Sequence, residues 1–256
     1  MCNFQRKETD NIVKNARRTK TFIVTTVLAA AGLAGYAASA SHSLHPAFAL
    51  AVLALAAVTS RMKVKLPGIN GNMSVNLPFL LTAAVSLSAA EAIMITCVST
   101  AVQCWPRKKA KFNWEQMTFN VSMMTFACCL ASLTFHAEWL RRMSWGSTTL
   151  GLALAAVTLF LGQTGPVAAV IALSEGKAAG ATWWSLAHFS FPYYVLSAGI
   201  SSMVQTVSSH LGWQLALGVF PLMYGIYRSY RIYSGNPADS KQDAPQVLVR
   251  SAGAGG

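Results

Sequence analysis

Residues 21–60 read TFIVTTVLAAAGLAGYAASASHSLHPAFALAVLALAAVTS and contain no Asp, Glu, Lys or Arg. Further charge-free runs follow along the chain, among them 116–137, 143–174 and 178–227. About 20 apolar residues in helical conformation are enough to cross the hydrocarbon core of a bilayer. Because each run reaches that length, the sequence predicts an all-α fold, a polytopic transmembrane helical bundle.

The composition points the same way. Of the 256 residues, 54% are hydrophobic and only 11% are charged, whereas a soluble domain carries about 25% charged residues. These values exclude a soluble enzyme, a nucleic-acid-binding protein and a disordered chain. The net charge of +12 is therefore first an indication of membrane topology, because Lys and Arg accumulate on the cytoplasmic side of membrane proteins.

A map of about eight membrane segments places all but Arg141 and Arg142 of the 20 Lys and Arg residues on one side. This map predicts a multi-pass protein of the bacterial inner membrane with both termini in the cytoplasm. It divides the chain into a basic cytoplasmic arm at 1–20, the bundle at 21–233 and a disordered cytoplasmic tail at 234–256.

Two short segments interrupt the regular helical pattern before residue 90. Residues 62–76, MKVKLPGINGNMSVN, alternate charged and apolar residues around Asn70-Gly71, a pattern typical of a β-hairpin or an ordered loop, here at the cytoplasmic surface. Residues 77–87 then form an apolar piece of about 16 Å, too short to cross unaided. Ser88-Ala-Ala-Glu91 is a capping box that predicts a new helix start, so the short piece is expected inside the bundle or as a re-entrant element.

Later in the chain, proline and glycine predict two more interruptions. Gly162-Gln-Thr-Gly165-Pro166 is expected to kink the helix that contains it. Residues 183–191 are expected at the membrane interface, with Pro192 opening the next helix.

Polar side chains at membrane depth beside interrupted helices are how many membrane bundles build ligand sites. Ser86 and Gln205 belong to this group of polar residues, and the aromatic segment 182–194 could line an apolar pocket. The alternatives are that Glu91 only caps its helix, that the amides join helices, and that the aromatic segment anchors the chain at the interface. The predicted ligand-binding residues are Asn76, Ser88, Glu91, Asn120, Gln163, Thr164 and His188.

No catalytic motif, metal site or cofactor site is predicted. The five cysteines include no C-x-x-C pair and are expected to be reduced and structural. His42 and His45 have no acidic partner nearby in the sequence, so a polar loop is favoured over a metal site. His136 and Glu138 could form an acid–base pair of an interface enzyme, but no second cluster completes a mechanism.

Five stretches carry a resemblance to a known family: SRMKVKLPGINGNMSVNLPFLL (60–81), EAIMITCVSTAVQCWPRKKAKFNWEQMTFNVS (91–122), GPVAAVIALSEGK (165–177), SFPYYVLSAGI (190–200) and YGIYRSYRIY (224–233). In pattern and order they resemble the membrane-associated sensor (MASE-type) domains that precede diguanylate cyclase and HD-GYP output domains in bacteria. The resemblance implies a sensor that binds a small apolar ligand or reports membrane state. In that family the last helix continues into an output domain; because a short polar tail follows here, we expect signalling through a cytoplasmic partner.

A more distant similarity links VKLPGINGNMSVNLPFLL (64–81) to the substrate-binding membrane subunits of energy-coupling-factor vitamin transporters. Their following helix usually opens with a Gly-Pro-like turn, whereas this chain has Ser88-Ala-Ala-Glu91. The expected partners are membrane lipid, a small apolar ligand and a signalling protein, without nucleic acid, and self-association is left open.

Overall fold

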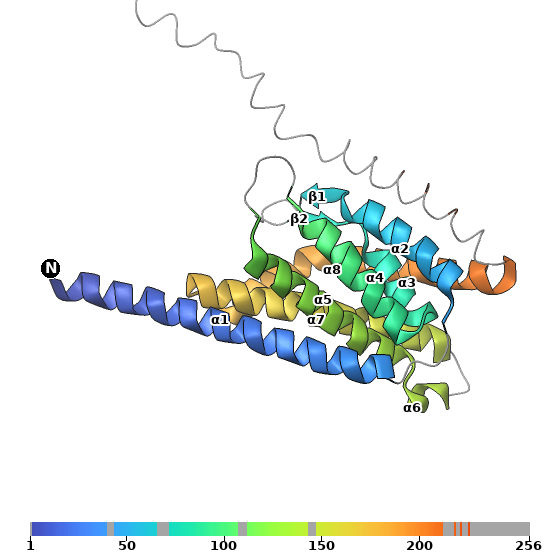
Figure 1. Cartoon of the computed structure of the whole chain (residues 1–256), viewed down its shortest axis with the longest axis horizontal. Coiled ribbons are helices and arrows are strands. Elements are labelled where there is room, and N and C mark those ends of the chain that lie inside the picture. Colours follow the sequence, from blue (N-terminus) through green and yellow to red (C-terminus); the bar gives the residue numbers. More distant parts are fainter. Residues whose placement is uncertain are drawn as a thin grey trace, which may run out of the picture. The chain divides into compact units, whose positions relative to one another are not determined.

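The computed structural model describes residues 2–39, 44–65, 72–106, 112–142 and 147–211, together with the single residues 218, 221 and 225. Internal contacts divide the chain into two units, Met1–Val219 and Phe220–Gly256. The expected last helix and polar tail lie outside the described residues, apart from those three positions. In chain order the elements are α1 (Cys2–Ser39), α2 (Pro46–Ser60), β1 (Lys63–Lys65), β2 (Asn72–Ser74), α3 (Leu77–Ser86), α4 (Ala89–Cys104), α5 (Trp114–Phe135), α6 (Glu138–Arg141), α7 (Ser147–Glu175) and α8 (Ala179–Leu211) (Figure 1).

The helix starts follow local sequence signals. Pro46 occupies the first turn of α2, where its missing N–H and fixed φ cost nothing. The capping box at the start of α4 is confirmed in both halves: the Ser88 side chain accepts from the Glu91 backbone, and the Glu91 side chain accepts from the Ser88 backbone. Asn113 caps α5 by accepting from the N–H of Gln116 at 3.1 Å.

Helix α3 lies in the middle of the bundle. All of its residues from Leu77 to Val85 are buried, and it contacts α2, α4, α5, α7 and α8 (Figure 1). Ten residues make a helix about 15 Å long, which confirms that the short piece is enclosed by its neighbours. A helix that is apolar on all sides needs such an enclosure.

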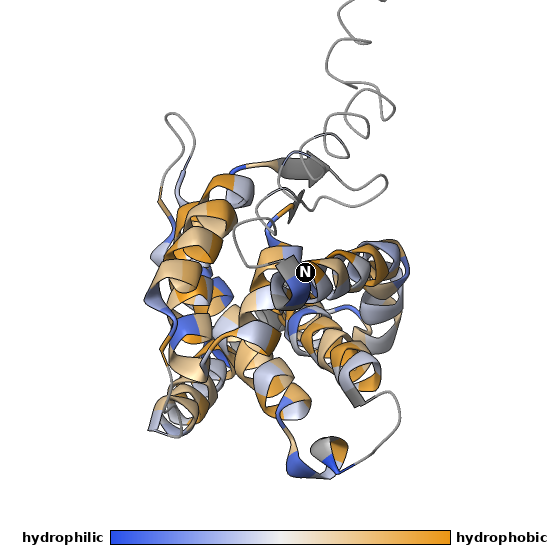
Figure 2. Ribbon diagram, turned by 90° about the vertical axis from the view of Figure 1, so that its right-hand side faces the viewer, coloured by the Kyte–Doolittle hydropathy of each residue, from blue (hydrophilic) through white to orange (hydrophobic). Residues whose placement is uncertain are grey.

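Within the part of the chain that the structure describes, three helical stretches are long and apolar enough to cross a membrane: Arg17–Ser39, Trp114–Leu140 and Thr148–Glu175. The expected eight membrane segments are not supported, because Pro46–Ser60, Leu77–Ser86 and Ala89–Cys104 are apolar but shorter. At 1.5 Å per residue, even the 16 residues of α4 reach only about 24 Å. Figure 2 shows hydrophobic residues along the outer sides of the helices as well as between them.

Two expected interruptions are absent from the described helices. α7 continues through Gly162 and Pro166 as one helix, and α8 continues through residues 183–191 and Pro192. An interior proline removes one backbone hydrogen bond and favours a kink, but the turns on either side keep theirs, and packing against neighbouring helices stabilises them. α1 likewise includes the basic residues before position 20, so the arm and the first apolar segment form one helix.

The segment between α2 and α3 contains two three-residue strands. They pair antiparallel, with Lys63 opposite Ser74 and Lys65 opposite Asn72. Residues 66–71, which include Asn70 and Gly71, lie outside the described residues. The backbone N–H of Val75 donates to the carbonyl of Met62 at 3.1 Å, so the paired segment begins immediately after α2 and leads directly into α3.

Candidate functional site

The carboxylate of Glu91 joins the start of α4 to the start of α2. It is 5% exposed and accepts three hydrogen bonds. Oε2 accepts from the Ser88 backbone N–H at 3.1 Å and from the Ser88 hydroxyl at 2.7 Å. Oε1 accepts from the backbone N–H of His45 at 2.6 Å, across 46 positions of sequence. Glu91 therefore caps its own helix and also fixes the entry to α2.

A cavity of about 540 Å³ lies beside this contact. Its walls come from the start of α2, the end of α3 and the last turns of α8, and they combine apolar side chains with a few polar groups. The described residues that line it are Leu44, His45, Pro46, Ala47, Phe48, Ser86, Gln205 and Ser208.

The chemistry of the lining defines what the cavity can hold. Its volume is within the range of small-molecule sites, about 300–1,000 Å³, which are mostly apolar with a few polar groups that fix orientation. Ser86, Gln205 and Ser208 supply hydroxyl and amide groups that donate and accept. No Asp, Glu, Lys or Arg is among the described lining residues. The cavity therefore suits a neutral molecule with an apolar body and a hydrogen-bonding group.

The second predicted cluster, at Gln163 and Thr164, joins α7 to α8. The Trp183 indole N–H donates to the Thr164 hydroxyl at 3.1 Å, and that hydroxyl donates to the carbonyl of Phe160 at 2.7 Å. The Tyr194 hydroxyl donates to the side-chain oxygen of Gln163. These contacts match the alternative in which polar side chains hold neighbouring helices together.

The other three predicted residues lie on different elements. Asn76 is the N-cap residue of α3 and is 3% exposed, and its side-chain nitrogen has no hydrogen-bond partner among the described residues. The side-chain nitrogen of Asn120 donates to the sulfur of Cys104 at 3.4 Å, which links α5 to α4. His188 is exposed on α8 and makes an edge contact with the ring of Phe189.

Of the seven predicted residues, the hydrogen bonds described for the structure connect Ser88 with Glu91, whereas Gln163 and Thr164 bond to α8. A single site formed by all seven stays a prediction. The segment 44–48 and Ser208 were not among them. Pro46 signalled only a helix start, and nothing local in the sequence shows that His45 meets Glu91.

Within the described chain, no hydrogen bond joins His136 to Glu138, the alternative acid–base pair. Nδ1 of His136 lies 2.9 Å from the carbonyl oxygen of Ser132, and the exposed Glu138 pairs with Arg142 at 3.5 Å. Among the described residues, no group of three or more His, Cys, Asp or Glu side chains could hold a metal ion. Among the cysteines whose side chains the structure describes, Cys97, Cys104, Cys128 and Cys129 are free thiols.

Comparison of the chain with protein families, characterised proteins and solved structures gives no significant match. The features of the chain that bear on its function are therefore the cavity, the Glu91 contact and the distribution of polar and apolar residues.

Proposed function

We propose that the chain is an integral membrane protein of the bacterial inner membrane, in which α1, α5 and α7 cross the bilayer and the other helices pack among them and return the chain between these crossings. Aromatic side chains at the helix ends support this proposal, because Trp is enriched at membrane interfaces. Trp105 and Trp114 are 58% and 70% exposed at one end of α5, and both contact the ring of Phe112. Trp139 is 53% exposed just beyond the other end.

The length of α5 agrees with this placement. Its 22 residues span about 33 Å, close to the 30 Å thickness of the hydrocarbon core. The paired strands and the basic segments beside them are then cytoplasmic, as are both termini, according to the distribution of Lys and Arg. In this arrangement the cavity lies toward the opposite, outer face.

Within this membrane bundle, we propose that the chain acts as a small-molecule sensor. The observation that carries the proposal is the cavity beside the Glu91 contact, which joins apolar and neutral polar groups from three helices. The resemblance to MASE-type sensor domains agrees with this function. The ligand is a small, largely apolar molecule that carries a hydroxyl, carbonyl or amide group.

The position of the cavity suggests how binding could be transmitted. One wall is the entry to α2, which a single carboxylate fixes. Another wall is the end of α8, where Gln205 and Ser208 precede the expected last helix. A ligand shifts the packing of these helices only to the extent that it binds one arrangement more tightly than the other. The expected output is a cytoplasmic partner that reads the chain after α8.

The binding step is tested by filling the cavity. The protein would be purified in mild detergent, and native mass spectrometry would detect small molecules that remain bound. Ala47→Phe places a ring in the cavity and is expected to abolish this binding. Ala54→Phe, on an exposed position two turns along the same helix, is the matched control and should leave it unchanged. Equal occupancy in the two variants would refute the cavity as the binding site.

The signalling step is tested separately by affinity purification of the tagged chain from native membranes. A cyclase, phosphodiesterase or kinase that depends on residues 212–233 for co-purification would support the sensor. A pair of ATPases would instead indicate a transporter subunit of the energy-coupling-factor type. Turnover by the isolated chain that is lost in His136→Ala would indicate an interface enzyme.

A further inference from the structure

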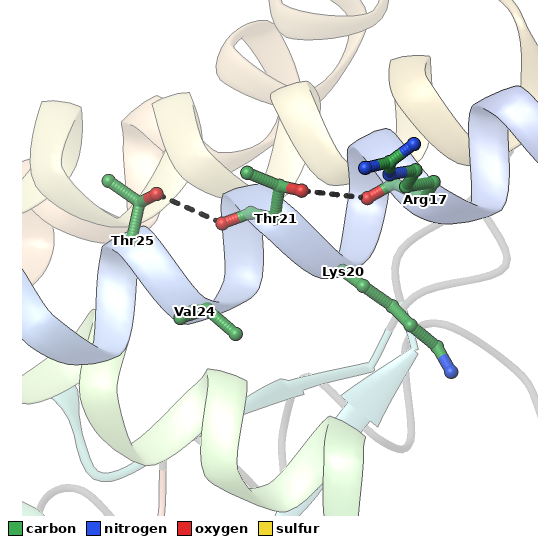
Figure 3. Close-up of a pocket in the computed structure, with 5 residues that line it drawn as sticks. All are labelled: Arg17, Lys20, Thr21, Val24 and Thr25. Atoms are coloured by element: carbon green, nitrogen blue, oxygen red, sulfur yellow. Dashed lines mark hydrogen bonds between the residues drawn. The ribbon is translucent and has the colours of Figure 1, made fainter.

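A second cavity, of about 510 Å³, lies along α1. The described residues that line it are Arg17, Lys20, Thr21, Val24 and Thr25 (Figure 3). Their spacings of one, three and four residues place them on neighbouring turns of the helix, with the side chains of Arg17, Thr21 and Thr25 toward one edge of this side and those of Lys20 and Val24 toward the other (Figure 3). The helix stretch Arg17–Ser39 is apolar enough on average to cross a membrane, and only 11% of its most apolar window is buried. This side of α1 is therefore open to whatever surrounds the bundle.

The lining changes in character along the helix. Arg17 and Lys20 come first, the hydroxyl of Thr21 follows, and the exposed side chains of Val24 and Leu28 lie further along, on either side of Thr25. Arg17 is also the first residue of the stretch that is long and apolar enough to cross a membrane. The order of cation, hydroxyl and apolar side chain is the order of phosphate, glycerol backbone and acyl chain in a phospholipid.

The two cations are available to a ligand. Lys20 pairs with Glu115 at 3.8 Å, but both side chains are about 70% exposed, and such surface pairs contribute little. The hydroxyls of Thr21 and Thr25 donate to the carbonyls of Arg17 and Thr21, at 3.0 and 2.9 Å (Figure 3). Since the hydroxyl protons are used within the helix, recognition of an anion falls to the guanidinium and the ammonium groups.

We propose that this side of α1 binds an anionic phospholipid of the surrounding bilayer. The phosphate lies against Arg17 and Lys20, and one acyl chain lies along Val24 and Leu28. Charge complementarity selects an anionic headgroup, because basic residues next to a membrane attract acidic lipids. The apolar continuation selects a lipid over a soluble phosphate. The site does not involve the cavity beside Glu91, so either can exist without the other.

The test compares two double variants in nanodiscs of phosphatidylcholine that contain phosphatidylglycerol with the same acyl chains. Native mass spectrometry would count each lipid that stays bound after release from the nanodisc. Arg17→Gln with Lys20→Gln is expected to lower the preference for phosphatidylglycerol by about thirty-fold, since each basic residue near the surface contributes about five-fold. The control is Lys63→Gln with Lys65→Gln, which removes the same amount of charge from the segment after α2. It should lower the preference for phosphatidylglycerol by less than about three-fold.

Equal losses in the two double variants would show a general basic surface and would overturn the proposed site. No loss in the Arg17 and Lys20 variant would overturn it as well. Addition of glycerol 3-phosphate distinguishes a lipid site from a site for a soluble phosphate. Displacement of the bound lipid would mean that only the anion is recognised and would overturn the proposal. Retention of the lipid would support a site that binds both the headgroup and the acyl chain. Melting of the variants in pure phosphatidylcholine verifies that they fold.

Discussion

Replacing Glu91 by alanine should destabilise the bundle more than any change at an exposed acidic residue. The substitution removes the acceptor for three hydrogen bonds, from the Ser88 backbone, the Ser88 hydroxyl and the His45 backbone. It therefore breaks one half of the capping box and also releases the entry to α2 from the start of α4. The first effect is local to one helix, and the second disconnects two helices.

The magnitude follows from these two losses. Loss of a helix cap costs about 1 kcal/mol, and loss of a hydrogen bond to a charged acceptor costs about 1.5–3 kcal/mol. Glu91→Ala should therefore lower the free energy of unfolding by about 2–4 kcal/mol. For a chain of this size, that corresponds to a fall in melting temperature of about 5–15 °C. Glu91→Gln keeps one acceptor oxygen, so its melting temperature should lie between those of the wild type and Glu91→Ala.

The assay is thermal unfolding in detergent, followed by the fluorescence of the native tryptophans. Glu115→Ala is the matched control: Glu115 also lies in the first turn of a helix, but its pair with Lys20 is long and exposed. It should change the free energy of unfolding by less than about 0.5 kcal/mol. Equal melting temperatures for the Glu91→Ala and Glu115→Ala variants would refute the reasoning.

Two predictions concern α7. A Cβ at Gly162 would lie 2.9 Å from Cβ of Ala127 on α5, whereas at Gly165 it would meet nothing within 4 Å. Gly162→Ala should therefore lower the free energy of unfolding by about 1–3 kcal/mol through overpacking. Gly165→Ala should raise it by about 0.5–1 kcal/mol. In thermal unfolding, the two variants should shift the melting temperature in opposite directions, and equal shifts would contradict this prediction. Tyr194→Phe removes the donor to Gln163 and should cost about 1 kcal/mol, and an unchanged melting temperature would show that this bond contributes nothing.

The sequence predicted correctly those structural features that depend only on residues close together along the chain. The Ser88–Glu91 capping box needs only a spacing of three residues, and the structure contains both of its hydrogen bonds. The short apolar helix after Asn76 was also predicted, because its length rules out an unaided crossing. Sequence could not show that five other helices enclose it, since that arrangement depends on tertiary packing.

The prolines were misleading for a physical reason. Pro166 and Pro192 predict interruptions, but α7 and α8 pass through both. Ring contacts of Phe160 with Phe191 and Tyr194 hold the two helices together around these positions. The number of membrane segments was overestimated because apolar helices of 10–16 residues look like partial spans in sequence.

Only part of the candidate cavity could be predicted from sequence. A single sequence shows which polar residues lie within apolar segments, and Glu91, Ser86 and Gln205 were identified in this way. The contact between Glu91 and the backbone of His45 involves no side chain of His45, so residue identity could not indicate it. Ser208 and Ala47 line the cavity through the way α8 and α2 converge.

The most direct measurement of ligand binding is hydrogen exchange of residues 44–48 in the purified full-length protein. The backbone N–H of His45 is bonded to Glu91, and the same segment lines the cavity. Exchange would be followed before and after bound small molecules are removed by detergent washing, with mass spectrometry to verify their removal. Removal should speed the exchange of residues 44–48 while exchange in the middle of α5 stays unchanged. Unchanged exchange of 44–48 after verified removal would contradict this prediction.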